Sequence, residues 1–588
     1  MPVMICSVFE MLNTLTPNAL RRSLTVGLTI SSCLVISCGG RVPSPAERSD
    51  TFCYNEPDGI ASLDPAVASY RSAMWAGSHL FNGLVELDSA LSIAPSLARS
   101  WSVDPRGLEW TFSLRTDVWF HRDPCFGSMQ TRRVTAADVK YSIERICDAA
   151  TKSTGLWAFR TVIDGADAFH QRTRRGQSGG ISGITVVNDS VVTIRLTKPF
   201  APFLAVLTMP YAWIVPYEAV RAYGANFGRH PVGTGPFKFH AWTQDIELLL
   251  ERNTQYFKTD ERGERLPYLE RVRISFLRDP KIEFLEFTRG RLDMVTGIDG
   301  SFAPTIVDAT GALRPPYDTL VLRRAPAQSI EYYGMLLDTT LPAAQASPYS
   351  QRRLLRQALN LAIDRHRIVT YVLHGRGMPA SHGVLPPSMP GFSSATRGYT
   401  YDPDSARRLL ALAGYPNGNG LPPVILQLGN SERTAAVAEA VQEMWRSIGI
   451  PVELRMVDFP QHLSMVRAGE LALWRTSWLG DYPDPENFLA LFITATTAPG
   501  GPNTTRIARR DLDSLYAAAL DPTRSFEERA SLYHRMEEII VAEAPWVFLY
   551  HDLVVRLTQR TVNGLSVDGA DRLLLERVTK TPRRTAAH

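Results

Sequence analysis

Two glycine-containing patterns in the sequence could belong to an enzyme. The run Gly176-Gln-Ser-Gly-Gly180 has the spacing of a serine nucleophile turn, but such a serine needs a buried strand before it and a helix after it. The basic run Arg172-Thr-Arg-Arg175 precedes this serine and instead predicts a loop. Gly233 and Gly235 lack the third glycine of a dinucleotide-binding turn, and Pro236 follows them. Neither pattern therefore predicts catalysis.

Metal chemistry is not indicated either. His366, His374 and His382 do not have the spacing of a zinc site, and the sequence contains neither HExxH nor CxxC. We therefore expect a protein that is not an enzyme, with no metal and no cofactor.

The acidic residue Asp481 is the most distinctive candidate for binding. It lies in the run Trp478-Leu-Gly-Asp-Tyr-Pro-Asp-Pro485. A carboxylate that is shielded from water selects a cation strongly, because a charge-assisted hydrogen bond replaces the lost hydration. The alternative is that Asp481 caps a turn before Pro483, since Asp484-Pro485 is a turn-forming pair.

Basic and aromatic residues flank Asp481. The planar guanidinium of Arg475 suits bidentate recognition of a carboxylate, although an arginine on a strand also commonly forms a structural ion pair. Trp474, Trp478 and Tyr482 could form the walls of a binding site or belong to the core.

Bulk composition excludes some classes of protein. The chain has 588 residues, and 63 Lys and Arg nearly balance 59 Asp and Glu. This length predicts several domains, and the balanced charge does not indicate nucleic-acid binding.

The first 50 residues have the features of an export signal. Arg21 and Arg22 precede an apolar run, Leu24–Ile36, that is short for a membrane span. The run ends at Cys38 in a context that resembles a bacterial lipobox, which predicts a lipoprotein signal peptide over 1–37 and a lipidated Cys38 at the start of a tether over 38–50. The alternatives are an ordinary cleaved signal and an uncleaved anchor, and Met11 is an alternative start.

Processing at Cys38 would leave Cys53, Cys125 and Cys147 in the mature chain. An oxidising compartment permits one disulfide among them, and the sequence does not choose the pair.

The elements that position these residues alternate between helices and strands, which favours an α/β fold. Residues 97–200 contain turn-rich segments that predict β meanders. Apolar spacing and capping residues predict five helices, and a strand over 452–456 follows the fourth; the helices are marked by Thr135 to Ile146, Leu354 to Leu361, Asp402-Pro403, Val437 to Ile448, and Ser525 to Ile539.

Several segments, in order along the chain, resemble the family 5 solute-binding proteins of ABC importers, the oligopeptide-, dipeptide- and nickel-binding type. They are Leu63-Asp-Pro65, Leu80-Phe-Asn-Gly-Leu-Val85, Trp110-Thr-Phe-Ser-Leu-Arg115, Val134-Thr-Ala-Ala-Asp138, Val232-Gly-Thr-Gly-Pro-Phe237, Arg356-Gln-Ala-Leu-Asn360 and Trp478 to Pro485.

The resemblance implies a two-lobed periplasmic-binding-protein fold with two crossover strands and a small extra domain inserted in the first lobe. We expect the crossings near Arg323–Ser329 and Ala544–Leu549. The implied domains are the first lobe over 51–80, 182–322 and 549–588, the inserted domain over 81–181, and the second lobe over 323–548.

The resemblance also implies a function. We expect a monomer, lipid-anchored in the cell envelope or periplasm, that captures a di- or oligopeptide between its lobes and delivers it to an ABC permease and ATPase. In peptide-binding relatives the residue matching Asp481 pairs with the ligand's ammonium group, an arginine matching Arg475 lies near ligand carboxylates, and Trp474, Trp478 and Tyr482 are candidate wall residues.

One departure from the pattern weakens the assignment to long peptides. Gly59 stands where some oligopeptide receptors have an acidic residue near the ligand. A nickel chelate, an oligosaccharide or an opine therefore remain alternative ligands, and a tethered peptide sensor without transport remains an alternative role.

Overall fold

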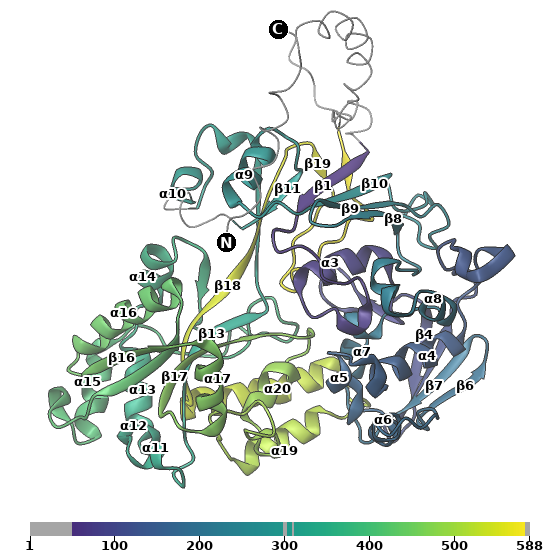
Figure 1. Ribbon diagram of the computed structural model, residues 1–588. Coiled ribbons are helices and arrows are strands. Elements are labelled where there is room, and N and C mark those ends of the chain that lie inside the picture. The colour runs from purple at the N-terminus through teal and green to yellow at the C-terminus, as the bar shows by residue number, and fades with distance from the viewer. Residues whose placement is uncertain (1–49, 298–302, 309–310, 582–588) are drawn as a thin grey trace, which may run out of the picture. The chain divides into compact units, whose positions relative to one another are not determined.

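The computed structural model describes residues 50–297, 303–308 and 311–581 (Figure 1). The predicted signal peptide, Cys38 and the tether up to Ser49 lie outside these ranges. Within them, no helix is both long enough and apolar enough to cross a membrane.

A four-stranded sheet near the N-terminus starts the first lobe. Its strand order is β1 (Thr51–Asn55), β10 (Arg271–Ser275), β9 (Glu247–Arg252) and β8 (Phe237–Thr243), with β1 parallel to β10. The alternating burial along these strands turns Phe52, Leu250 and Val272 into the core, against helix α3 (Arg71–Leu80).

A second antiparallel sheet contains β4 (Ala98–Val103), β5 (Glu109–Leu114), β7 (Val191–Arg195) and β6 (Ile184–Asn188). Residues 97–200 thus contain the predicted β structure, with helix α4 (Ala136–Cys147) packed on the sheet. The predicted N-cap at Thr135 takes the form of a capping box, because the side chains of Thr135 and Asp138 each bond the other's backbone amide.

One cluster of buried apolar residues contains side chains from both of these sheets. Strands β6 and β7 pair with β5 although they lie beyond residue 181. We therefore propose that the inserted domain includes this whole sheet and extends through β7, beyond the predicted boundary at residue 181.

The second lobe is built on one part of a larger mixed sheet, the part around β13 (Ser329–Met335), which is buried along its whole length. Its path runs β11 (Met294–Thr296), β18 (Trp546–Thr558), β13, β17 (Leu473–Leu479), β15 (Val424–Gly429) and β16 (Val452–Val457). Two short strands, β12 (Val321–Pro326) and β14 (Gly377–Pro379), also pair with β18.

Helices cover both faces of this sheet, because neighbouring residues of β13 point into different apolar clusters: Tyr333 into one and Tyr332 into the other. The predicted helices and the strand β16 are confirmed; the helices are α13 (Arg353–Leu361), α15 (Pro403–Leu412), α16 (Glu432–Arg446) and α20 (Phe526–Glu543).

Strand β18 connects the two parts of the molecule. Its first half pairs with β13, as Trp546 does with Gly334, and its second half pairs with β12 from Leu553 onward. The predicted first crossing lies where β12 ends and β13 begins. The predicted second crossing, Ala544–Leu549, lies where β18 still pairs with β13; it ends four residues before Leu553, where the pairing with β12 begins.

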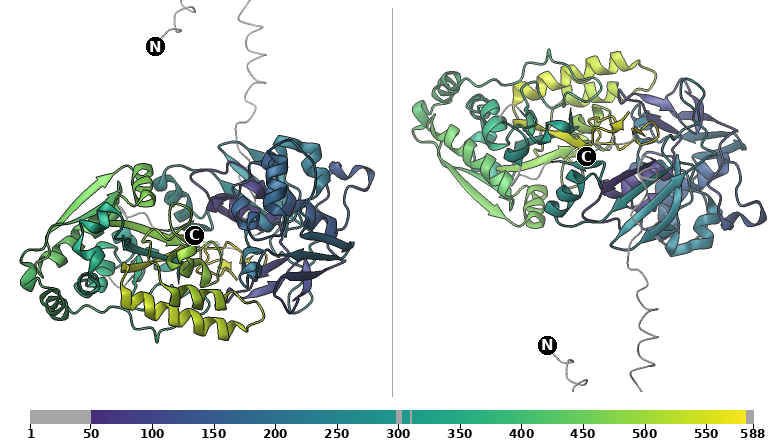
Figure 2. Two further views of the ribbon diagram at one scale, coloured as in Figure 1. Left: turned by 90° about the horizontal axis from the view of Figure 1, so that it is seen from below. Right: turned by 90° about the horizontal axis from the view of Figure 1, so that it is seen from above.

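The chain therefore has a two-lobed α/β fold. The purple-to-blue elements of the first lobe and the green elements of the second stand beside each other in both views of Figure 2. Two adjacent extended segments join the lobes: the connection from β12 to β13, and β18, which pairs with both of these strands.

The three cysteines of the described chain, Cys53, Cys125 and Cys147, are all free. The disulfide that the sequence permits is therefore not formed among them. Burial raises the pKa of the Cys53 thiol to about 11 and that of Cys147 to about 12, which makes both poor nucleophiles at neutral pH.

Candidate functional site

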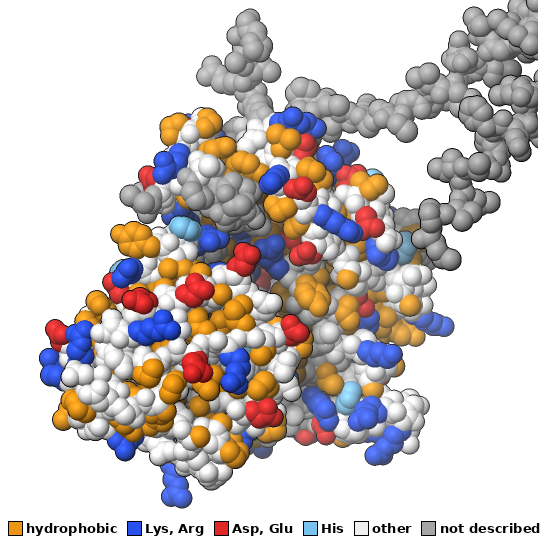
Figure 3. Space-filling model, turned by 60° about the vertical axis from the view of Figure 1, so that its left-hand side comes forward, with side chains coloured by type: hydrophobic (Ala, Val, Ile, Leu, Met, Phe, Trp, Pro, Cys, Tyr) orange, Lys and Arg blue, Asp and Glu red, His pale blue; other side chains and the backbone are white. Residues whose placement is uncertain are grey.

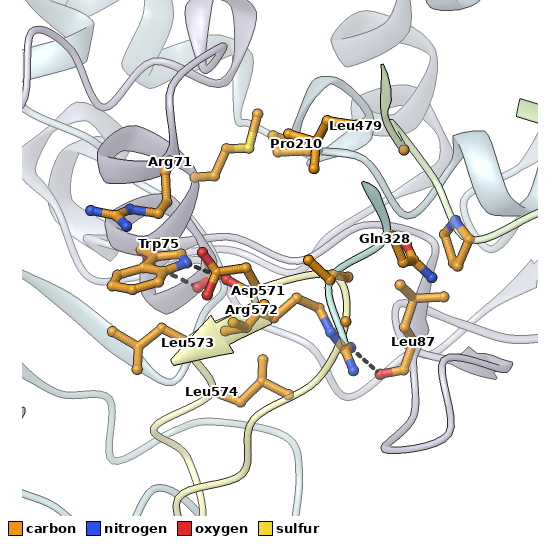
Figure 4. A pocket seen from close by; sticks show the side chains of 18 of the residues that line it. Arg71, Trp75, Leu87, Pro210, Gln328, Leu479, Asp571, Arg572, Leu573 and Leu574 are labelled. Atoms are coloured by element: carbon orange, nitrogen blue, oxygen red, sulfur yellow. Dashed lines mark hydrogen bonds between the residues drawn. The ribbon is translucent and has the colours of Figure 1, made fainter. Parts of the chain in front are cut away.

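A cavity of about 1040 Å³ takes its walls from both lobes. The space-filling view shows this face hollowed, with Lys and Arg side chains inside the hollow (Figure 3). Much of the lining comes from α3 and residues 208–213 of the first lobe, from the crossing at Ala327 and Gln328, from the loop after β17, and from residues 552–555 and 569–576 (Figure 4).

Asp481 lies in this lining, on the loop that begins where β17 ends. Asn487 holds the residue from two sides: its Nδ2 donates to Asp481 Oδ2 at 3.3 Å, and its Oδ1 accepts the Asp481 amide at 3.1 Å. Asp481 forms no ion pair with any described residue. Asp481 is exposed at the cavity surface, yet the surrounding protein removes enough of its hydration to raise its pKa.

The residues after Asp481 fix its loop. The Asp484 Oδ1 accepts the Glu486 amide, as a turn requires, and its Oδ2 accepts from Arg529 at 2.6 Å. The Tyr482 hydroxyl donates to Glu486 Oε2 at 2.6 Å. Burial raises the pKa of Glu486. The side chain of Asp484 therefore stabilises the turn. The carboxylate of Asp481 is left available to the cavity.

Three of the other four residues expected in the site lie elsewhere. Of the five, the structure brings Asp481 and Tyr482 to the cavity lining, and Arg475, Trp474 and Trp478 are not part of that lining. Arg475 donates to Glu331 Oε2 at 2.5 Å. Trp474 is 0% exposed, with its ring against Gly334, and the Trp478 Nε1 donates to Asn487 Oδ1 at 3.0 Å.

The first lobe contributes a wall that the sequence analysis missed. One face of α3 presents Arg71, Met74, Trp75 and Ser78 to the cavity, at helical spacing. The Trp75 Nε1 donates to the Asp571 carbonyl, 2.5 Å away, and two guanidinium groups lie close to the centre of its ring, that of Arg71 at 4.8 Å and that of Arg556 at 4.9 Å. In the sequence, each of these four residues lies three or four positions from two of the others, and that spacing places them on one face of a helix.

Arg71 is weakly held. Its Nη2 lies 3.5 Å from Glu56 Oε2, and the other oxygen of this buried carboxylate has no hydrogen-bond partner. Burial raises the pKa of Glu56 to about 7. Gly59, the departure from the oligopeptide-receptor pattern, adopts φ +70° and is not in the cavity lining.

Most other charges in the lining are already paired. Lys258 Nζ lies 2.7 Å from both oxygens of Glu86 and 3.4 Å from Glu576, and Arg433 pairs with Asp552. Arg572 donates to the Leu87 carbonyl (Figure 4). Arg376 differs, because it forms no ion pair with any described residue. A carboxylate, Asp481, and a cation, Arg376, are therefore both available to a ligand.

Comparisons with known proteins agree with this architecture. The family model described as "Bacterial extracellular solute-binding proteins, family 5 Middle" matches residues 92–500. Heme-binding protein A of Haemophilus influenzae is 27% identical over 91% of this chain and 94% of its own. The dipeptide-binding protein of Escherichia coli K12 is 26% identical over 83% and 86%.

Among solved structures, the unliganded open form of MppA, a periplasmic murein tripeptide binding protein, superposes with a TM-score of 0.76 at 23% identity, covering 90% of this chain and 97% of its own. This likeness supports the two-lobed fold. Because the family model spans more than half of the chain, the protein belongs to the bacterial extracellular solute-binding proteins of family 5.

Proposed function

We propose that this protein is the periplasmic binding component of an ABC importer and captures a di- or oligopeptide in the cavity between its lobes. The observation that carries the proposal is the Asp481 carboxylate, which faces the cavity, has no ion-pair partner among the described residues and is partly stripped of water. A peptide ammonium group would restore the lost interactions of that carboxylate.

Charge complementarity supports a zwitterionic ligand. Arg376 is available at the same cavity, so a ligand that carries both an ammonium and a carboxylate group could satisfy both protein charges. The names of two relatives point to the same class, since one is a dipeptide-binding protein and another a murein tripeptide binding protein. Tyr482 would contribute to the wall, while Arg475, Trp474 and Trp478 would support the loop that carries Asp481.

The proposal extends to anchoring and partners. We propose that Cys38 is lipidated, that the protein is a monomer at the periplasmic membrane surface, that it catalyses no reaction, and that it delivers its ligand to a permease and ATPase. Labelling with a radioactive fatty acid tests the anchor: the wild-type chain should incorporate the label, and Cys38→Ala should not.

The test of the ligand is calorimetric titration of the purified protein with Ala-Ala, Ala-Ala-Ala and their N-acetylated forms. We expect the free peptides to bind and acetylation to weaken binding at least about a hundredfold, because it removes the charge that Asp481 recognises. Asp481→Asn should cause a similar loss, whereas Asp458→Asn, an exposed residue outside the cavity, should bind like wild type.

Binding should also depend on pH in a defined direction. An ionised Asp481 is required, and its pKa is raised, so affinity should fall on acidification at a higher pH than for an ordinary aspartate. Equal binding of acetylated and free peptides would contradict the proposal. So would saturation by a nickel chelate, an oligosaccharide, an opine or heme in the absence of peptide binding.

A further inference from the structure

We infer that the first-lobe wall of the cavity is a preformed subsite for a bulky apolar, preferably aromatic, side chain of the bound peptide. The inference rests on the proposed function and narrows it to a ligand class. It is carried by a group of large apolar residues in the lining, which we call the aromatic shelf: Met74, Phe81, Trp157, Met209, Tyr211 and Trp213.

The first part of the shelf depends on a glycine in α3. The rings of Phe81 and Trp213 stack with their centroids 5.9 Å apart and their planes 18° from parallel. A Cβ at Gly77 would lie 2.4 Å from the Trp213 ring. Only glycine therefore lets the Trp213 indole lie directly on α3. Phe81 stacks on this indole, and Trp213 also lines the cavity.

A second glycine seats the neighbouring ring. A Cβ at Gly155 would lie 2.2 Å from the ring of Tyr211, and the Tyr211 hydroxyl lies 3.2 Å from the Thr154 hydroxyl. The Tyr211 ring is thus held at one edge by its hydroxyl group, and it packs against the backbone of Gly155, which carries no side chain. Two aromatic rings are fixed in position before any ligand arrives, which lowers the entropy lost on binding.

Trp157 completes the shelf and is unusual for its exposure. Its side chain is 48% exposed and lines the same cavity as these rings. From the second lobe, Leu479 is 69% exposed, lines the same cavity, and stands two residues before Asp481 in the chain. Figure 4 shows Leu479 and Pro210 on one side of the pocket.

These exposed apolar side chains favour a ligand that covers them. Burying aromatic and aliphatic surface is favourable in proportion to its area, and aromatic pairs gain further from their geometry. The thioethers of Met74 and Met209 adapt to rings of different shape. The volume of about 1040 Å³ also leaves room for a large side chain beside the peptide backbone.

The experiment compares peptides that differ by one side chain. Purified protein is titrated with Ala-Ala-Ala, with the three peptides that carry one Phe at the first, second or third position, and with Ala-Glu-Ala. We expect at least one Phe peptide to bind tenfold or more tighter than Ala-Ala-Ala. Trp157→Ala, which changes an exposed residue, should lower this Phe-to-Ala ratio at least fivefold, and Trp213→Leu provides a second, independent change to the shelf.

Tyr371→Ala is the matched control, because this aromatic residue is 73% exposed and does not line the cavity; its ratio should equal that of wild type. Equal affinities for the Phe and Ala peptides, with all of them weakened by Asp481→Asn, would overturn the subsite and leave the proposed function standing. A Phe preference that survives both tryptophan changes, or tighter binding of Ala-Glu-Ala, would also overturn it. Failure of every peptide to bind would instead remove the proposed function, and the subsite with it.

Discussion

Asn487 shows how one buried amide organises the candidate site. It contacts Asp481 through both its oxygen and its nitrogen and accepts the indole N–H of Trp478. Because a charged side chain facing water would otherwise move freely, this amide orients the carboxylate before the ligand arrives. Asn487 is therefore a positioning residue, and it touches no ligand in the proposed scheme.

Replacing Asn487 should show whether it positions the Asp481 carboxylate or only stabilises the fold. Asn487→Leu should weaken peptide binding about tenfold and lower the free energy of unfolding by about 1–3 kcal/mol, since it leaves polar partners unsatisfied. Asn503→Leu is the matched control: Asn503 is fully buried and donates to the Ile493 and Ile507 carbonyls. It should destabilise the protein similarly without changing peptide affinity. Titration and urea unfolding of both variants test this, and equal affinity losses would refute the positioning role.

At the scale of elements, helix α20 carries a capping box at its N-terminus and a buried glutamate, Glu537, further along. Ser525 and Glu528 form the predicted capping box at its start. Further along, Glu537 is 1% exposed, and its Oε1 accepts the amides of Val384 and Leu385 at 3.0 and 2.9 Å. The helix thereby holds an irregular segment of the second lobe, and burial raises the pKa of Glu537 to about 8.

This raised pKa predicts a pH dependence of stability. The folded state holds the proton more tightly than the unfolded state, whose pKa is near 4.5, so unfolding becomes easier as pH rises from about 4.5 to 8. Wild-type protein should lose a few kcal/mol of unfolding free energy over that window. Glu537→Gln mimics the protonated acid and should flatten the curve in urea titrations at pH 5, 7 and 8.5. Identical slopes for the two proteins would show that Glu537 does not carry the effect.

At the scale of the whole molecule, two neighbouring backbone segments join the lobes. The amide of Ala327 donates to the Asp552 carbonyl at 2.8 Å, so the two segments are tied to each other at the crossing. Gln328 also links them to the site, because its amide donates to Gly569 and its carbonyl accepts from Gly480, each at 2.8 Å. A ligand that contacts both lobes would favour closure about this crossing.

Closure should be visible in solution. Adding a saturating peptide should reduce the radius of gyration measured by small-angle X-ray scattering. At a hundred times its Kd, the peptide should stabilise the folded state by about 2.7 kcal/mol. Asp481→Asn should show neither change at the same peptide concentration, and Asp458→Asn should show both. A radius that is unchanged while the peptide binds would mean that capture does not require the lobes to move.

The sequence by itself determined the family, the two-lobed α/β fold and five helices. Local signals suffice for these: capping residues, apolar periodicity, and short motifs whose order along the chain is preserved, as in Thr135 to Asp138 and Ser525 to Glu528. Asp481 could be selected as a candidate for the same reason, since its neighbours 478–485 form such a motif.

Only the tertiary structure decided what surrounds Asp481. Arg475 is close to it in sequence, yet a strand alternates its side chains between two faces, and β13 supplies Glu331 on the face that Arg475 takes. Trp75, Trp157 and Trp213 are hundreds of residues away and reach the same cavity because the chain crosses between the lobes. Which charges are paired and which remain available depends on contacts between distant segments, and no pattern of neighbouring residues records those contacts.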